Sequence, residues 1–148
     1  MWECSKCGRI FRSTNQPHSC KKIPLEKHFK GKDGAREIFD YLVEQIEKGI
    51  GKCKIISIPC CIHLFGTYDF LAALPKKDRL EIRFAYGGKI DSKRLKTSVL
   101  MSLNIYKNCF DIYFIEEIDK EFIEWVKKSY FIKNGGETAQ GVIDKRST

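Results

Sequence analysis

The sequence lacks any long apolar run. The longest stretch with an apolar bias, residues 55–65, is interrupted by Ser57, Pro59 and His63 and is too short to span a bilayer. The first residues are polar and charged, without the hydrophobic segment of a secretory signal peptide. We therefore expect a soluble, cytoplasmic protein that makes no membrane contact.

Several catalytic signatures are also missing. The chain has no internal repeat, no glycine-rich loop that could cradle a phosphate, and no carboxylate–lysine pattern typical of nucleases. The neighbouring carboxylates Glu116, Glu117 and Asp119 are better interpreted as favourable charge at a helix N-terminus than as an acid–base pair. An enzyme is therefore the less favoured interpretation.

The chain does contain enough material for one domain and a small appendage. Its 148 residues are 43% hydrophobic and 31% charged, which can fill a core and keep the surface hydrated. The seven cysteines are odd in number, and three of them fall within the first twenty residues. In a chain with no sign of secretion, such a cluster favours thiolate metal ligands over disulfides.

Residues 1–22 are predicted to form a zinc knuckle. Cys4 and Cys7 have the spacing at which one tight turn presents two thiolates to a tetrahedral ion, and Gly8 can adopt the positive φ that such a turn uses. Phe11 is placed to pack over this turn, with Trp2 on its other side. The chain then returns through a turn-forming segment. A thioredoxin-like role is less favoured, because no strand precedes the cysteines. The predicted ligands of a closed, structural Zn²⁺ site are Cys4, Cys7, His18 and Cys20.

The rest of the chain predicts an α+β domain over residues 33–133, preceded by a basic connector over residues 23–32. Asp33 is expected to cap a helix in which apolar residues recur at helical spacing until Gly49. The period then changes to two, which indicates strands. The predicted strands cover residues 54–58, 61–65, 69–74, 79–86, 99–106 and 110–114.

Alternation along residues 79–86 predicts one buried face and one exposed face, the latter with Glu81 and Arg83. Asp119 is expected to cap a C-terminal helix, and residues 134–148 are predicted to be a disordered tail. The complete prediction is an antiparallel β-sheet meander flanked by an N-terminal and a C-terminal helix, with the zinc knuckle in front.

Positive charge is unevenly placed. The formal net charge is +8, and it concentrates in residues 1–32 and 76–96. Two basic regions on a nearly neutral body suggest an anionic partner, with nucleic acid as the candidate; the alternative is ordinary solubilising charge. The candidate anion-binding side chains are Lys76, Lys77, Arg79, Arg83 and Arg94.

Cys60, Cys61 and His63 lie together in an apolar stretch and could build a cysteine–histidine nucleophile. No third, orienting group is evident beside them, so we interpret them as core residues. The same interpretation applies to the two other thiols outside the knuckle, Cys53 and Cys109.

Taken together, the motifs resemble a known family. The pattern Trp-x-Cys-x-x-Cys-Gly-Arg-x-Phe closing on His-Ser-Cys, the segment at residues 70–77, and Asp119 leading to Trp125 are similar to the bacterial and archaeal family catalogued as domain of unknown function 5655. The resemblance extends to about residue 131, with a looser likeness to the YdhG-like domains. It implies a small α+β domain, sometimes found beside nuclease-like or DNA-modification modules, without an established activity. Ser5 departs from the proline that such knuckles often carry.

Two functions follow. The first is a non-catalytic, zinc-stabilised binding module with nucleic acid as partner. The alternative is an enzyme, or an enzyme accessory domain, acting on a small anionic or phosphate-containing substrate held by Arg79, Arg83 and Arg94. A nucleic-acid module predicts affinity that falls with salt, whereas an enzyme predicts a concave pocket with converging polar groups. A protein-interaction domain without either property is the third interpretation.

Overall fold

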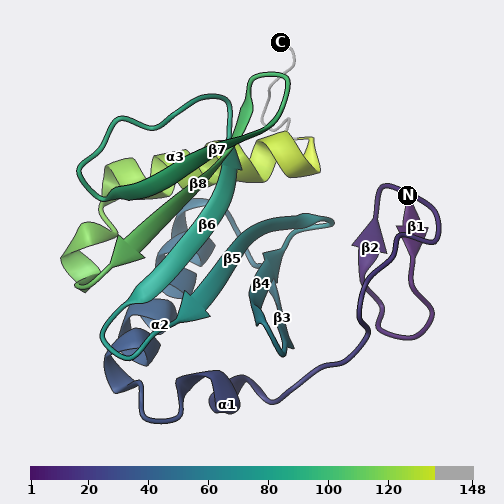
Figure 1. The fold of residues 1–148 in the computed structure, drawn as a ribbon, viewed down its shortest axis with the longest axis horizontal. Helices are drawn as coiled ribbons and strands as arrows, with labels where there is room; N and C mark the ends of the chain where they lie inside the picture. The colour runs from purple at the N-terminus through teal and green to yellow at the C-terminus, as the bar shows by residue number, and fades with distance from the viewer. Residues whose placement is uncertain (136–148) are drawn as a thin grey trace.

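A computed structural model describes residues 1–135 and divides them into an N-terminal knuckle and a larger α+β body (Figure 1). The body is a six-stranded antiparallel sheet with helices packed on one face, which confirms the predicted fold class. The predicted tail lies outside the described residues, except that Asn134 and Gly135 end the last helix. No helix within residues 1–135 is long and apolar enough to cross a membrane.

The connector contains a short helix, α1 (Leu25–Phe29), and the chain then enters α2 (Asp33–Gly49). Phe29 is buried, and its ring centroid lies 5.3 Å from that of Phe39 on α2. Asp33 is the first residue of α2 and not its cap, because Lys32 occupies the N-cap position and no side chain caps the helix. The side chains that α2 buries follow the predicted helical spacing: Ala35, Ile38, Phe39, Leu42 and Ile46.

The sheet departs from a simple meander at its second half. Its strand order is β3-β4-β5-β6-β8-β7, so β8 and not β7 lies beside β6. Residues 87–94 carry the chain past the place that β8 occupies, and β7 becomes the edge strand. The strand bounds are β3 (Lys54–Ile58), β4 (Cys61–Phe65), β5 (Asp69–Pro75), β6 (Leu80–Tyr86), β7 (Leu95–Ser102) and β8 (Ile105–Ile112).

The predicted strands at 99–106 and 110–114 were wrong in their bounds. The hairpin turn falls at residues 103–104, inside the first of these segments, and Asn104 adopts a positive φ of 59° there. An asparagine in the left-handed region is a turn signal that the apolar residues around it concealed. Strand β7 is also mostly exposed, including the side chains of Val99, Leu100 and Met101, because it lies at the edge of the sheet.

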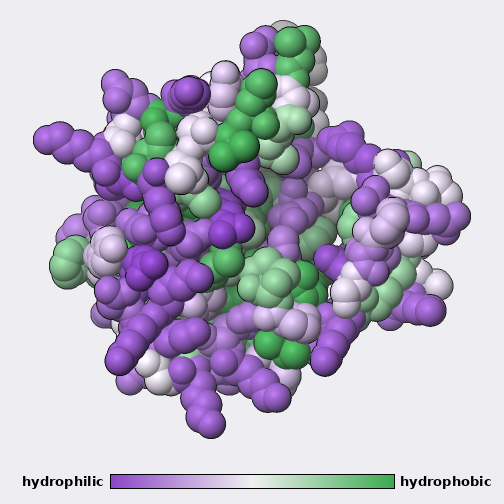
Figure 2. All heavy atoms as spheres, viewed as in Figure 1, coloured by the Kyte–Doolittle hydropathy of each residue, from purple (hydrophilic) through white to green (hydrophobic). Residues whose placement is uncertain are grey.

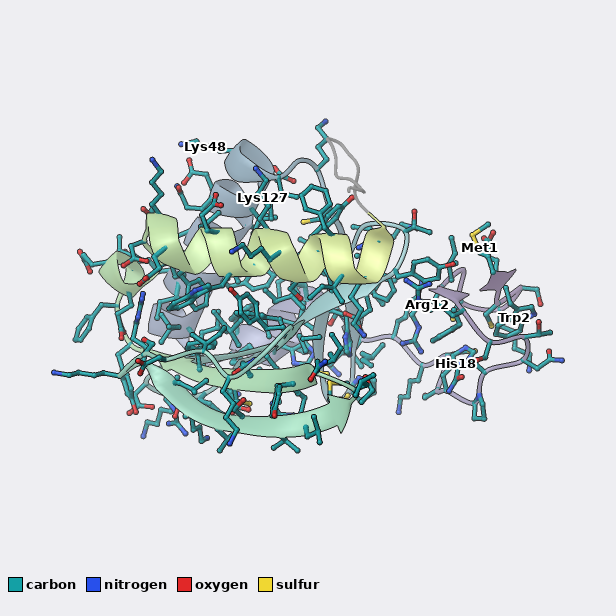
Figure 3. All side chains as sticks on the ribbon, turned by 90° about the horizontal axis from the view of Figure 1, so that it is seen from above. Met1, Trp2, Arg12, His18, Lys48 and Lys127 are labelled. Carbon is teal, nitrogen blue, oxygen red and sulfur yellow. The ribbon has the colours of Figure 1, made fainter. Side chains whose placement is uncertain are left out.

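The core lies between the sheet and its helices. A 3-10 turn, η1 (Ile115–Glu117), leads into α3 (Lys120–Asn134), and the Asp119 carboxylate accepts a hydrogen bond from the Phe122 N–H at 2.9 Å, as predicted for a cap. Phe122 is fully buried and meets Phe84 and Phe110 edge-on, with ring centroids 5.9 and 5.2 Å away. Figure 3 shows α3 lying across one face of the sheet.

The opposite face of the sheet is without a helix in Figure 3, yet it is only partly exposed. Glu81 points to this face and is 3% exposed, with Arg83 Nη2 at 2.6 Å and Lys96 Nζ at 3.3 Å from its carboxylate oxygens. The prediction of an exposed face along residues 79–86 was therefore wrong. Ion pairs with Arg83 on β6 and Lys96 on β7 cover the carboxylate, and alternation along one strand carries no information about the partner on β7.

Candidate metal centre

The knuckle is built on a two-stranded ribbon, β1 (Trp2–Glu3) paired with β2 (Ile10–Phe11). The turn between the strands carries Cys4 and Cys7. It is closed by hydrogen bonds from the Gly8 N–H to the Cys4 carbonyl, at 2.8 Å, and from the Cys4 N–H to the Arg9 carbonyl, at 2.9 Å. Gly8 has a φ of 78°, as the sequence predicted, and that backbone conformation lets the chain reverse directly behind the second thiol.

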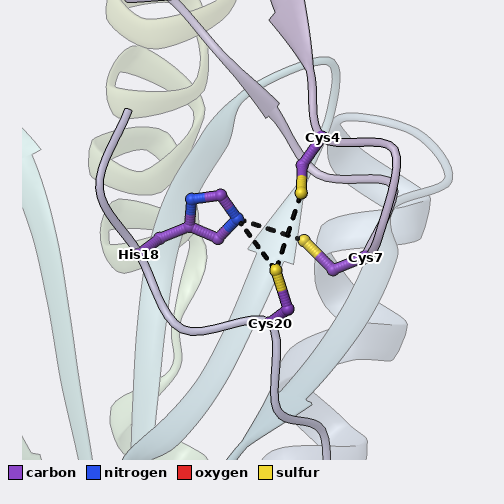
Figure 4. A group of neighbouring side chains, drawn as sticks. All are labelled: Cys4, Cys7, His18 and Cys20. Carbon is purple, nitrogen blue, oxygen red and sulfur yellow. Dashed lines mark hydrogen bonds between the residues drawn. The ribbon is translucent and has the colours of Figure 1, made fainter. Parts of the chain in front are cut away.

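The four predicted ligands converge on one point (Figure 4). Cys4 Sγ lies 3.6 Å from Cys20 Sγ, and Nε2 of His18 lies 3.4 Å from the Sγ atoms of both Cys7 and Cys20. A tetrahedral zinc ion would hold such sulfur and nitrogen atoms about 3.5–3.8 Å apart. The cluster therefore has the shape, the donor set and the size to hold a metal ion, and its four protein ligands would fill a tetrahedral ion completely.

The imidazole of His18 is oriented for ligation. Its Nδ1–H donates to the Gln16 carbonyl at 2.6 Å, which leaves the Nε2 lone pair facing the sulfur atoms. Metal-binding histidines characteristically use their second nitrogen in this way, because the hydrogen bond fixes both tautomer and ring orientation.

The thiols favour a cation between them. The Cys7 N–H lowers the pKa of Cys4. Burial opposes ionisation of Cys7, but hydrogen bonds from Arg9 and His18 bring its pKa to about 6. The contact with Cys4 and burial raise the pKa of Cys20 to about 11. Ionisation of the third thiol, that of Cys20, is thus the one that the neighbouring groups oppose, and a divalent cation bound between the thiolates would remove this opposition.

Aromatic and cationic side chains close the knuckle around this centre. The Phe11 and His18 rings lie 4.5 Å apart, and Trp2 contacts both, with centroids 6.0 and 5.9 Å away. Trp2 and Phe11 face each other across the ribbon, so they cover the same side of the site and not opposite sides as predicted. The buried Arg9 donates to the Ser19 carbonyl and ties the two ligand pairs together.

The knuckle meets the body through a small set of contacts. The Arg12 guanidinium lies 4.5 Å from the centroid of the Tyr68 ring and donates to the Lys133 carbonyl near the end of α3. The Ile23 N–H donates to the Ser57 carbonyl of β3 at 3.1 Å. In Figure 1 the knuckle lies beside the sheet and is joined to it by the extended connector. The cysteine–histidine cluster therefore lies within residues 1–22 and does not contribute to the core of the body.

The predicted anion-binding side chains do not gather at one place. Arg79 and Arg83 lie on the open face of the sheet, where they pair with Asp111 and Glu81. Arg94 lies on the other side, against the ring of Trp125 on α3, and pairs with two carboxylates there. Lys76 and Lys77 lie at the β5–β6 turn. Binding of an anion by these five residues stays a prediction, and carboxylates already engage the three arginines.

The structure adds one group that the sequence interpretation lacked. His63 Nε2 lies 3.1 Å from Cys61 Sγ, and His63 Nδ1 lies 2.6 Å from an oxygen of Asp69. Asp69 reaches this position because β5 folds back along β4 and pairs it with Phe65. The sequence feature that could have indicated this contact is an acidic residue, Asp69, at the first position of β5. Burial and the neighbouring Cys60 raise the pKa of Cys61 to about 12, which does not suit a nucleophile at neutral pH.

Comparison with family models, with curated proteins and with solved structures found no match to this chain. The family resemblance drawn from the sequence therefore stays a prediction. The geometry of the cysteine–histidine cluster carries the functional conclusion.

Proposed function

We propose that the protein is a zinc-stabilised, non-catalytic binding module whose knuckle contacts single-stranded nucleic acid. The observation that carries the proposal is the convergence of three sulfur atoms and one imidazole nitrogen within residues 1–20. This donor set selects Zn²⁺ over hard cations such as Mg²⁺ or Ca²⁺, because thiolates are soft ligands and d¹⁰ zinc accepts a tetrahedron. A tetrahedral ion with four protein ligands has no position for water or substrate, which supports a structural role.

The charge of the loaded knuckle supports an anionic partner. Residues 1–22 carry five cationic side chains against Glu3, and a zinc ion with three thiolates contributes −1, which leaves a net charge of +3. Lys6 and Lys21 are exposed, so their charges are available to phosphates. Counterion release from the nucleic acid would then drive binding.

Aromatic surface next to these charges supports single-stranded nucleic acid as the partner. Trp2, Phe11 and His18 form a half-exposed aromatic group, and a small hollow between knuckle and body is lined by Phe11, Tyr68 and the cationic Arg12 and Lys133. Unpaired bases stack on such rings while the backbone follows the cations. Figure 2 shows the knuckle as a mixture of hydrophilic and intermediate residues beside the body.

A salt series tests the proposal. Binding of fluorescently labelled single-stranded DNA and RNA oligonucleotides is followed by anisotropy from low to high salt. Each phosphate contact to a single strand contributes a slope of about −0.7 in log K against log salt, so the double variant Lys6→Gln/Lys21→Gln should flatten the slope by about 1.4. The charge-matched control is Lys48→Gln/Lys128→Gln, whose residues are exposed on the helices of the body (Lys48 is labelled in Figure 3) and should leave the slope unchanged. Salt-independent binding, or equal slopes for both double variants, would contradict the proposal.

One observation favours the alternative, a protein that binds or converts a small anionic substrate. A hollow of about 250 Å³ beside β4 and β6 is lined by Cys61, His63, Asp69 and Arg83, so polar groups of both signs converge there. A small-molecule site predicts saturable binding of small anions that survives the loss of the knuckle cations. The Lys6→Gln/Lys21→Gln variant therefore separates the two functions.

A further inference from the structure

A second group of metal-ligating side chains lies in the body, at the hairpin between β3 and β4. Cys60 is in the turn, and Cys61 and His63 follow on β4. Cys60 Sγ lies 3.1 Å from Cys61 Sγ, which in turn lies 3.1 Å from His63 Nε2. Three ligand atoms from one short stretch of chain thus converge, without any contribution from the knuckle.

Local backbone geometry produces this convergence. Residues two apart on a strand share one face of the sheet, so Cys61 and His63 necessarily point the same way. Cys60 lies in the turn and brings its thiol beside that face. Asp69 Oδ2 lies 2.6 Å from Nδ1 of His63, the ring nitrogen that is not the one beside the thiols. Nε2 faces the thiols while the carboxylate lies beside the other ring nitrogen, the arrangement in which carboxylate partners orient ligating histidines.

We infer that Cys60, Cys61 and His63 form a second, independent site for a thiophilic divalent cation such as Zn²⁺, with its fourth position open to a small anion. Three protein ligands are the pattern of zinc sites that keep an exchangeable position. The present separations are shorter than the about 3.5–3.8 Å of a tetrahedral zinc site, so the ligands would move apart by a few tenths of an ångström. The exposed Cys60 can make this movement, because it lies in the turn.

The net positive charge of the surroundings favours an anion as the fourth ligand. Cys61 and His63 line the hollow of about 250 Å³, which opens this side of the site to solvent. Two thiolates balance a divalent ion, so the centre itself would be neutral. Three cationic side chains, Arg83, Lys107 and Lys133, line the hollow against one carboxylate, that of Asp69, which lies beside His63; the Arg83 guanidinium is itself paired with Glu81. A neutral metal beside cationic side chains attracts small anions over cations.

Cobalt titration of the full-length, reduced protein under anaerobic conditions tests the inference. We expect the protein to bind two equivalents of Co²⁺. The first binds tightly at the knuckle and has the charge-transfer intensity of three thiolates. The second binds more weakly at the hairpin and adds the charge-transfer intensity of two thiolates. Cys60→Ser should abolish the second equivalent and leave the first, and because this side chain is exposed, thermal unfolding should be unchanged. The matched control is Cys53→Ser, which removes a thiol that belongs to neither cluster and should keep both equivalents.

Two further measurements distinguish an organised metal site from nonspecific binding of the ion to free thiols. Asp69→Asn should weaken the second equivalent by about 10–100-fold, as removal of an outer-shell partner does, and leave the first unchanged. Added azide should shift the ligand-field bands of the second ion alone, because only that ion has an open position. Saturation of the wild-type protein at the knuckle's single equivalent would overturn the inference. Retention of both equivalents by Cys60→Ser, or azide shifts confined to the knuckle ion, would overturn it as well.

Discussion

Glu81 provides the sharpest test of how the body is held together. Its side chain is 4% exposed, whereas those of its partners Arg83 and Lys96 are 37% and 43% exposed. The Cys109 thiol is also near, with Sγ 3.6 Å from a carboxylate oxygen. Removal of Glu81 thus leaves two cations that can turn toward water, whereas removal of Arg83 leaves a buried carboxylate with one weaker partner.

This asymmetry sets the expected magnitudes. Breaking a fully buried ion pair costs about 3–5 kcal/mol, and exposed pairs are worth about 1 kcal/mol or less. Because both cations are more than a third exposed, we expect Glu81→Gln to lower the free energy of unfolding by about 1–2 kcal/mol. Arg83→Met, which leaves the carboxylate buried, should cost about 3 kcal/mol. The double variant Glu81→Gln/Arg83→Met should cost less than the sum of its parts.

Urea denaturation at pH 7 and at acidic pH measures these quantities. Burial opposes ionisation of Glu81, but Arg83 and Lys96 hold its pKa below the ordinary value. A depressed pKa contributes stability above the unfolded-state pKa, and this stability is lost as the pH falls through the folded-state pKa. The difference between wild type and Glu81→Gln should therefore shrink under acidic conditions. The reasoning is refuted if Glu81→Gln and Arg83→Met are equally mild and strictly additive.

Three other predictions concern the helix cap, a close contact and the metal centre. Asp119→Ala should lower the free energy of unfolding by about 1 kcal/mol and Asp119→Asn by much less, measured by urea denaturation at pH 7. Partial burial opposes ionisation of Asp119, but the Phe122 N–H and Arg94 keep its pKa below the ordinary 3.8. The stability difference between wild type and Asp119→Ala should therefore decrease as the pH falls below that value. Gly66→Ala should cost about 1–3 kcal/mol because the new methyl group would lie 2.6 Å from the Tyr130 ring, whereas Gly88→Ala meets open space; equal melting temperatures for the two would refute this contact. Acidification should release metal from the knuckle, because the Gln16 carbonyl raises the pKa of His18 and its proton competes with the ion; a chelator-competition assay showing equal affinity at pH 5 and pH 8 would contradict this assignment.

The features that could be predicted best from the sequence are those whose local backbone geometry depends on residue identity alone. The Cys4–Cys7 spacing, the turn glycine behind it and the Asp119 cap all specify local backbone shapes, and the structure has each of them. The order of strands could not be obtained in this way. Alternation of apolar and polar residues indicates which residues share a face of a strand, but it does not indicate which strands are neighbours. The position of β8 beside β6, with β7 at the edge, therefore could not be predicted from it.

The same limit explains the second cluster. Cys61 and His63 lie two residues apart in a predicted strand, so their proximity on one face could be predicted. Asp69 joins them only through the pairing of β4 with β5, which includes a shift of register between Leu64 and Phe65. Of the two ion-pair partners of Glu81, Arg83 is close in the sequence, whereas Lys96 on β7 reaches the carboxylate only through the fold. Side-chain clusters that depend on pairing register require the three-dimensional structure.

The metal content of the wild-type protein and of Cys7→Ser tests the central claim most directly. Both proteins are purified in full length from zinc-supplemented cultures, equilibrated with a weak chelator, and examined by elemental analysis and amide NMR. We predict that Cys7→Ser contains one zinc ion fewer per chain than the wild type, with spectral changes confined to the knuckle and its contacts near Tyr68 and Lys133. Wild-type protein without zinc, or equal zinc in both proteins, would contradict the assignment of Cys4, Cys7, His18 and Cys20 as its ligands.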